Sequence, residues 1–159
     1  MLTLHTGREL VLAWHGPGPA LPDGAVAVRG DRIAAVGPLE ALRERFPGAR
    51  VRSWPGVLGP GRTHTGALPP APSPRERVHA VLTTGATGVL AARVTDPALR
   101  SAAARAGVLV HAVAPDHAAG TAVLVEGGRA DLTAFGDAPG GGAECLVTVC
   151  AGRIVHRRR

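Results

Sequence analysis

The chain contains no tyrosine and no lysine, and aromatic residues make up only 3% of its 159 residues. A hydrophobic core must therefore be built from Val, Leu, Ile and Ala rather than from large rings. The scarcity of rings also disfavours a nucleic-acid-binding protein, because single-stranded nucleic acid is held largely by stacking on aromatic side chains. The formal net charge of +6 attracts anions, so a basic nucleic-acid binder stays as the least favoured alternative.

Long apolar runs and cysteine pairs are lacking as well. No segment approaches the length of a membrane span, and the N-terminal MLTLHTGREL carries charge and histidine too early for a signal peptide. Cys145 and Cys150 lie five positions apart, a spacing that places them on opposite faces of a strand, so we expect no disulfide between them. These absences favour a cytoplasmic, reduced protein that does not contact a membrane.

Turn-forming residues are abundant, with 22 Gly and 14 Pro, and this composition favours many short strands. Apolar runs at residues 10–14 and 25–29 indicate extended segments, and Gly30-Asp31-Arg32 predicts a hairpin turn after the second. A second hairpin is predicted where CLVTVC and RIVHR meet at Ala151-Gly152, and AVLVEGG and ADLTAFG are further extended candidates. The proline-rich stretch 55–74 is expected to be a connection, because proline cannot donate to a strand ladder.

The middle of the chain carries two helix signals. Residues 73–76, Ser-Pro-Arg-Glu, combine an N-cap serine, a proline at the first helical position and a capping-box glutamate. Thr95 or Asp96 caps a second helix, which Gly107 ends. The apolar runs GVLAARV and VLVHAVA follow the two helices, so we expect a β-α-β unit with parallel strands.

Five segments, taken in order, carry a resemblance to a known family. They are GAVAVRGDRIAAVGP with GVLGPGRTHTG near the start, RERVHAVLTTGATGVLAARVTD in the middle, and GGRADLTAFG and CLVTVCAGRIVHR near the end. In this order they resemble the amidohydrolase superfamily, specifically its imidazolonepropionase and aminodeoxyfutalosine deaminase-like branch. The two segments near the start and the two near the end are similar to the flanks that form one composite β-sandwich beside a TIM-like barrel in that family.

The resemblance implies an α+β, mainly β fold. We expect residues 1–60 and 118–159 to form a composite β-sandwich from the N- and C-terminal flanks. Residues 61–117 would then be a Pro/Gly-rich linker plus a short β-α-β remnant of the barrel. Most of the barrel is missing on this interpretation, because eight β-α units need about 250 residues.

The family's first metal motif is His-x-His at the end of the first barrel strand. His64 matches its first histidine, while Gly66 stands in the second place, and no lysine is present to be carbamylated, as some relatives require. Hydrolysis by zinc or iron needs about three protein ligands and an open position. His111 and His117 would join His64 if their strand end faces the THTG loop, with Asp116 as the general base.

The alternative is that His111 is a packed strand residue and that His64, Asp116 and His117 are solvated loop residues. Similarly, Asp131 in the Ala-Asp-Leu segment is expected to have a turn or sheet-edge role rather than a catalytic one.

By resemblance the chain is a hydrolase of non-peptide carbon-nitrogen bonds, with Zn or Fe as its cofactor if the metal site is complete. The missing ligand favours a truncated form with little or no activity of its own and no bound cofactor. A truncated barrel exposes strand edges and apolar surface. An alternative function is therefore a non-catalytic subunit that forms a homo-oligomer or binds a larger protein partner.

Overall fold

The computed structural model describes residues 1–113, 122–137 and 139–159, and the α+β, mainly β class is confirmed. The strands are β1 (Leu2–Leu10), β2 (Leu21–Pro22), β3 (Gly24–Arg29), β4 (Arg32–Pro38), β5 (Arg50–Pro60), β6 (Arg62–His64), β7 (Ala86–Leu90), β8 (Leu109–His111), β9 (Leu132–Asp137), β10 (Ala143–Cys150) and β11 (Arg153–Arg157). The helices are α1 (Leu39–Arg45), α2 (Pro74–Leu82) and α3 (Pro97–Ala106), with a 3-10 turn at Ala91–Arg93.

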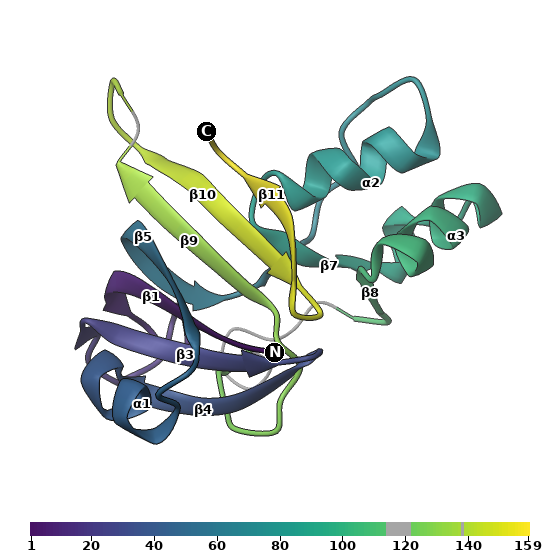
Figure 1. The fold of residues 1–159 in the computed structure, drawn as a ribbon. Helices are drawn as coiled ribbons and strands as arrows, with labels where there is room; N and C mark the ends of the chain where they lie inside the picture. The colour runs from purple at the N-terminus through teal and green to yellow at the C-terminus, as the bar shows by residue number, and fades with distance from the viewer. Residues whose placement is uncertain (114–121, 138) are drawn as a thin grey trace.

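Strands from the two ends of the chain share one sheet, in the order β11-β10-β9-β5-β1-β3-β4, with β2 paired to β1. The junction between head and tail is the antiparallel pairing of β5 with β9, which runs from Val57 opposite Phe135 to Pro60 opposite Leu132. Figure 1 shows β9 and β10 crossing above β1, β3 and β4, so the sheet is strongly twisted.

The main hydrophobic core is shared by the two flanks. One cluster joins Val26 and Val28 of β3 with Leu132 of β9 and Val147 and Val149 of β10. A smaller cluster lies where α1 covers the sheet, through Leu42 packed with alanines of β3 and β4. Burial of aliphatic side chains from both flanks therefore holds head and tail together, as the aromatic-poor composition predicts.

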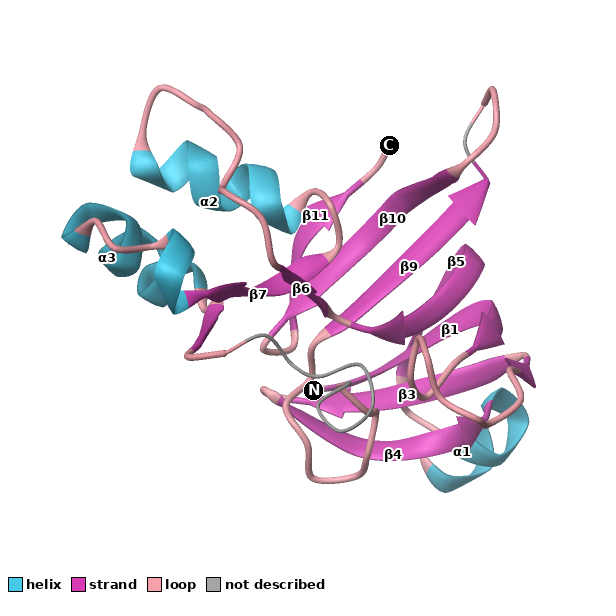
Figure 2. Ribbon diagram, turned by 180° about the vertical axis from the view of Figure 1, so that it is seen from behind, coloured by secondary structure: helices cyan, strands magenta, loops and turns pink. Residues whose placement is uncertain are grey.

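A second, three-stranded sheet has the order β6-β7-β8, with both pairs parallel. Its helices begin as the sequence indicates: Ser73 Oγ accepts from the backbone N of Glu76 at 3.2 Å, and Asp96 Oδ1 accepts from Ala98 N at 2.9 Å. Gly107 ends α3 with a left-handed φ of 77°, which favours glycine. In Figure 2, α2 and α3 lie side by side at the far end of the molecule from β4. The predicted β-α-β arrangement is confirmed.

The expectation that residues 55–74 form only a connection is wrong up to His64, because β5 continues to Pro60 and β6 follows at Arg62–His64. The pairing of β1 with β5 shifts register between Gly7 and Glu9, which lie opposite Trp54 and Val57. Pro55 and Gly56 fall in this bulge, where no ladder N–H is needed. Gly56 is also required for packing, since a Cβ there would lie 2.0 Å from the carbonyl oxygen of Phe135.

The first strand is also misplaced by the sequence pattern, since β1 ends at Leu10 where the predicted apolar run begins. Two buried polar residues, His5 and Thr6, interrupt the apolar pattern of β1. Both are satisfied inside the sheet. Trp54 Nε1 donates to His5 Nδ1 at 3.3 Å, and Thr6 Oγ1 donates to the carbonyl oxygen of Gly24 at 2.8 Å. The prediction of an extended segment at AVLVEGG is also wrong as regards a strand, because residues 122–128 contain none.

Cys145 and Cys150 are both free, as expected. The predicted reason is wrong, because a register shift between Cys145 and Val147 places Cys145 Sγ 3.4 Å from Thr148 Oγ1, on the face of β10 that Cys150 also occupies. Among the described residues, no helix is long and apolar enough to cross a membrane.

The buried His5 makes the stability of the fold sensitive to acid. Burial, aided by the nearby Arg52 charge, lowers the pKa of His5 from 6.5 to about 4. The unfolded chain therefore binds a proton between these values while the folded chain does not, so stability is present above pH 6.5 and falls as the pH drops toward 4. We expect a loss of about 3 kcal/mol over this range.

The measurement is urea unfolding at pH 7 and pH 4.5 for the wild type, His5→Gln and His156→Gln, the last being a half-buried histidine on β11. We expect His5→Gln to reduce the pH dependence and His156→Gln to retain it. An unchanged pH dependence in His5→Gln would contradict this assignment.

Candidate functional site

The ends of β6 and β8 place the two described histidines of the predicted metal site. In register, His64 lies beside Val89 of β7, Val89 lies beside Val110 of β8, and His111 lies beside Leu90. Neighbours in register share one face of a sheet, and successive residues alternate between faces. The side chains of His64 and His111 therefore leave opposite faces of the small sheet.

Each histidine contacts its own surroundings. His64 Nε2 donates to the carbonyl oxygen of Ala67 at 3.0 Å, just after the THTG segment. The ring of His111 lies against β7, because a Cβ on Gly88 would be 2.7 Å from its Nε2 atom. Glycine at position 88 thus makes room for this imidazole, and His111 is packed against the sheet as the alternative interpretation expects.

A hydrolytic zinc or iron ion needs three converging ligands. Among residues 1–113, 122–137 and 139–159, no group of three His, Cys, Asp or Glu side chains gathers in a way that could hold a metal. Two histidines on opposite faces do not fit such an ion. Asp116 and His117 lie outside the described residues, so the predicted site that includes them stays a prediction.

Near the starts of β6 and β8, Asp131 connects three parts of the chain. Its Oδ1 accepts from the backbone N of Ala151 at 2.8 Å, in the turn between β10 and β11, and its backbone oxygen accepts from Gly61 N at 2.9 Å, just before β6. Its Oδ2 lies 3.2 Å from Arg129 Nη1. Arg129 Nη2 in turn donates to the carbonyl oxygen of Gly107, at the end of α3.

The electrostatics of Asp131 agree with a structural role. Burial raises the pKa of its carboxyl above the ordinary value, and the Ala151 N–H, Arg129 and His111 oppose that rise. Both carboxylate oxygens already have partners in the fold. The expected turn role, rather than a catalytic one, is therefore supported by its contacts.

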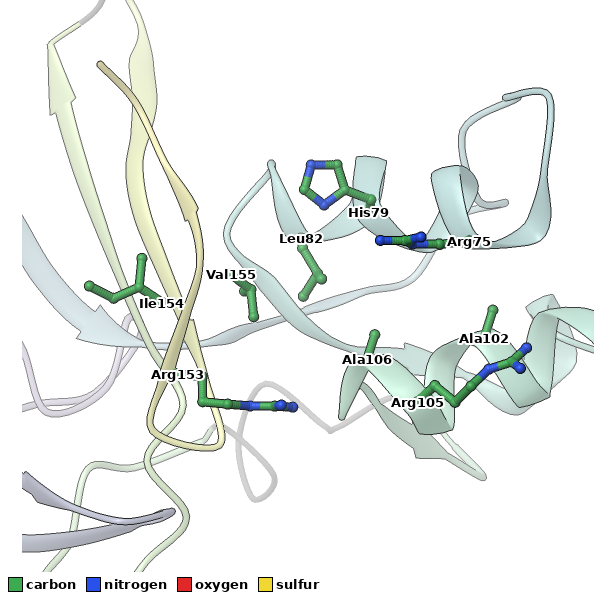
Figure 3. Close-up of a pocket in the computed structure, with 9 residues that line it drawn as sticks. All are labelled: Arg75, His79, Leu82, Ala102, Arg105, Ala106, Arg153, Ile154 and Val155. Atoms are coloured by element: carbon green, nitrogen blue, oxygen red, sulfur yellow. The ribbon is translucent and has the colours of Figure 1, made fainter.

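A hollow of about 710 Å³ opens between α2, α3 and β11, away from the strand ends. Figure 3 shows basic side chains around it and smaller apolar side chains between them. Sequence reasoning missed it because its residues come from three elements far apart in the chain and form no motif. The residues that line it are Arg75, His79, Leu82, Ala102, Arg105, Ala106, Arg153, Ile154 and Val155.

One family model matches part of the N-terminal flank. The model of the bacterial imidazolonepropionase-like composite domain matches residues 24–49, which contain β3, β4 and α1. This match covers the predicted strand, turn and strand of GAVAVRGDRIAAVGP. A search of curated proteins finds no match to the chain.

Several solved structures share the fold. Guanine deaminase from E. coli is 17% identical with a TM-score of 0.52, over 69% of this chain and 35% of that protein. A zinc-bound adenosine deaminase from Xanthomonas campestris is 20% identical with a TM-score of 0.52, over 68% and 32%. Guanine deaminase from Bradyrhizobium japonicum is 18% identical with a TM-score of 0.51, over 69% and 34%.

The chain spans about a third of the length of these solved structures. The family match shows that residues 24–49 resemble an imidazolonepropionase-like composite domain, and the solved structures show that the chain shares part of the fold of these deaminases. At these identities the likeness concerns the fold, and the zinc is a property of the Xanthomonas protein.

The contacts of Asp131 generate a stability prediction. We expect Asp131→Ala to lower the free energy of unfolding by roughly 3 kcal/mol, because it leaves the Arg129 charge without its counter-ion. Asp131→Asn keeps an acceptor for Ala151 N and should cost less. Denaturant unfolding measures both. Asp137→Ala, which removes an exposed carboxylate from β9, is the matched control and should have little effect, whereas equal losses at both positions would contradict the role of Asp131.

Proposed function

We propose that this chain is a truncated form of an amidohydrolase-like protein, with little or no activity of its own toward carbon-nitrogen bonds. The observation that carries the proposal is the divergence of His64 and His111 at the strand ends where the family resemblance would place a metal. Among the residues that the structure describes, a single imidazole of the predicted site on each face leaves a catalytic ion without the three ligands that would activate a water molecule.

The path of the chain supports the same proposal. A complete barrel takes about 250 residues, and the connection from the end of β8 at His111 to the start of β9 at Leu132 is too short to hold the remaining β-α units. On this proposal, residues 61–117 are the barrel remnant and residues 1–60 and 118–159 are the composite sandwich.

A second candidate function, an assembly subunit, follows from β8. Within the described strands, β8 pairs only with β7, so its other edge is open. Leu109, Val110 and Val113 are 40%, 43% and 78% exposed along this segment. An open, apolar edge strand is a template for pairing with another chain. We propose a second copy as the partner, because two β8 edges can pair antiparallel about a two-fold axis.

The metal test compares wild type, His64→Ala and His111→Ala after incubation with Zn²⁺ and desalting, with metal content measured by atomic emission. We expect much less than one zinc per chain in all three proteins, and no difference between them. His156→Ala serves as the control for non-specific imidazole binding. One zinc per wild-type chain, lost in both the His64 and His111 variants and retained in the control, would overturn the proposal.

The assembly test measures molar mass by light scattering over a range of concentrations. We expect the wild type to approach the mass of a dimer and Val110→Arg to remain monomeric, because a guanidinium cannot be buried unpaired in the new interface. Leu12→Arg places the same charge on an exposed apolar position after β1 and should still dimerise. A monomeric wild type at every concentration would refute pairing through β8.

A further inference from the structure

The hollow between α2, α3 and β11 collects positive charge from three directions. Arg75 and His79 lie one turn apart on α2, Arg105 comes from α3, and Arg153 begins β11. In Figure 3, the side chain of Arg153 extends from β11 toward Ala106 at the end of α3. Its Nη2 atom would lie 3.6 Å from a Cβ on Gly107, so it reaches the end of that helix.

These basic side chains have no acidic partner among the described residues. No carboxylate lines the hollow, and none of its three arginines forms an ion pair with the described residues. Other arginines of the chain do have counter-ions, such as Arg43 beside Glu40 and Arg129 beside Asp131. Several unneutralised cations around one concave surface give a positive potential that concentrates anions there.

The surface between the charges is apolar. Leu82 and Ala102 are buried side chains of the core that holds α2, α3 and β7 together, and Ile154 and Val155 are half-buried. Guanidinium groups bind planar carboxylates and phosphates through paired hydrogen bonds. The aliphatic surface adds a place for a hydrophobic group. At about 710 Å³, the hollow is within the size range of small-molecule sites.

We propose that this hollow binds a small organic anion, with a carboxylate or phosphate held by Arg75, Arg105 and Arg153 and an apolar body against Leu82 and Val155. The proposal is independent of the function proposed above, because it uses none of the residues at the strand ends. Nothing in it requires a metal or a catalytic step.

The test is isothermal titration of the whole chain with four probes: phenyl phosphate, benzoate, inorganic phosphate and the neutral benzyl alcohol. We expect one site per chain for an aryl anion, with binding weakened by salt. Inorganic phosphate and benzyl alcohol, each carrying only half of the recognised chemistry, should bind at least about tenfold more weakly. The stronger of the two aryl probes identifies the anionic group.

The variants are Arg105→Gln and Arg153→Gln, which remove a charge and keep much of the side chain. Each should weaken binding of the aryl anion by about tenfold or more, since a hydrogen bond to a charged group contributes roughly 1.5–3 kcal/mol. Arg43→Gln, an exposed arginine on α1, is the matched control and should bind as the wild type does. Circular dichroism and thermal unfolding establish that each variant is folded.

Absence of saturable binding by both aryl anions would overturn the proposal. So would equal affinity for benzyl alcohol, or unchanged affinity in folded Arg105→Gln and Arg153→Gln. The metal and light-scattering results described above do not affect these outcomes, so the two proposals fail separately.

Discussion

The arrangement of the molecule depends on the ion pair between Asp131 and Arg129. Through this pair and its backbone contacts, the turn after β10, the end of α3 and the residue before β6 are held at one point. Head and tail are also joined by β5–β9 pairing and a shared aliphatic core, which are distributed interactions. The ion pair is different, because it fastens the small parallel sheet and its helices to the large sheet through a few atoms. Its low exposure to solvent makes the loss of either partner costly.

Local signals allowed the middle of the fold to be predicted. Ser73 and Asp96 cap their helices with their own side chains, so their effect does not depend on the rest of the chain. The strands β1 and β5 were harder, because their regularity depends on tertiary contacts. His5 is tolerated inside β1 only through Trp54, and Pro55 is tolerated inside β5 only because a bulge removes the need for its N–H. Neither compensation can be read from the local pattern.

In the candidate sites, too, features set by local sequence could be predicted and features set by tertiary contacts could not. The family resemblance implied a strand end at His64, where β6 does end, and the segment around Asp131 indicated a turn or sheet-edge role. Both depend on neighbours along the chain. The sequence could not show that His64 and His111 leave opposite faces, because facing depends on the register of two strands against β7. The basic hollow could not be predicted from the sequence at all. Arg75, Arg105 and Arg153 are scattered in the sequence, and only the packing of α2, α3 and β11 brings them together.

The core around α2 and α3 explains how a sheet of three strands can be stable in this setting. Val78, Val81 and Leu99 of the helices pack with Val89 of β7, and the same cluster includes Cys150 of β10 and the half-buried Val155 of β11. The C-terminal hairpin thus supplies apolar surface to the helices as well as to the large sheet. Because that hairpin closes the second core, the small sheet gains burial without further barrel strands, while one edge of β8 pairs with none of the described strands. Within the described part of the chain, two surface features are left without a partner, namely one edge of β8 and the arginines around the hollow. A strand edge favours pairing with another strand, and uncompensated positive charge favours anions.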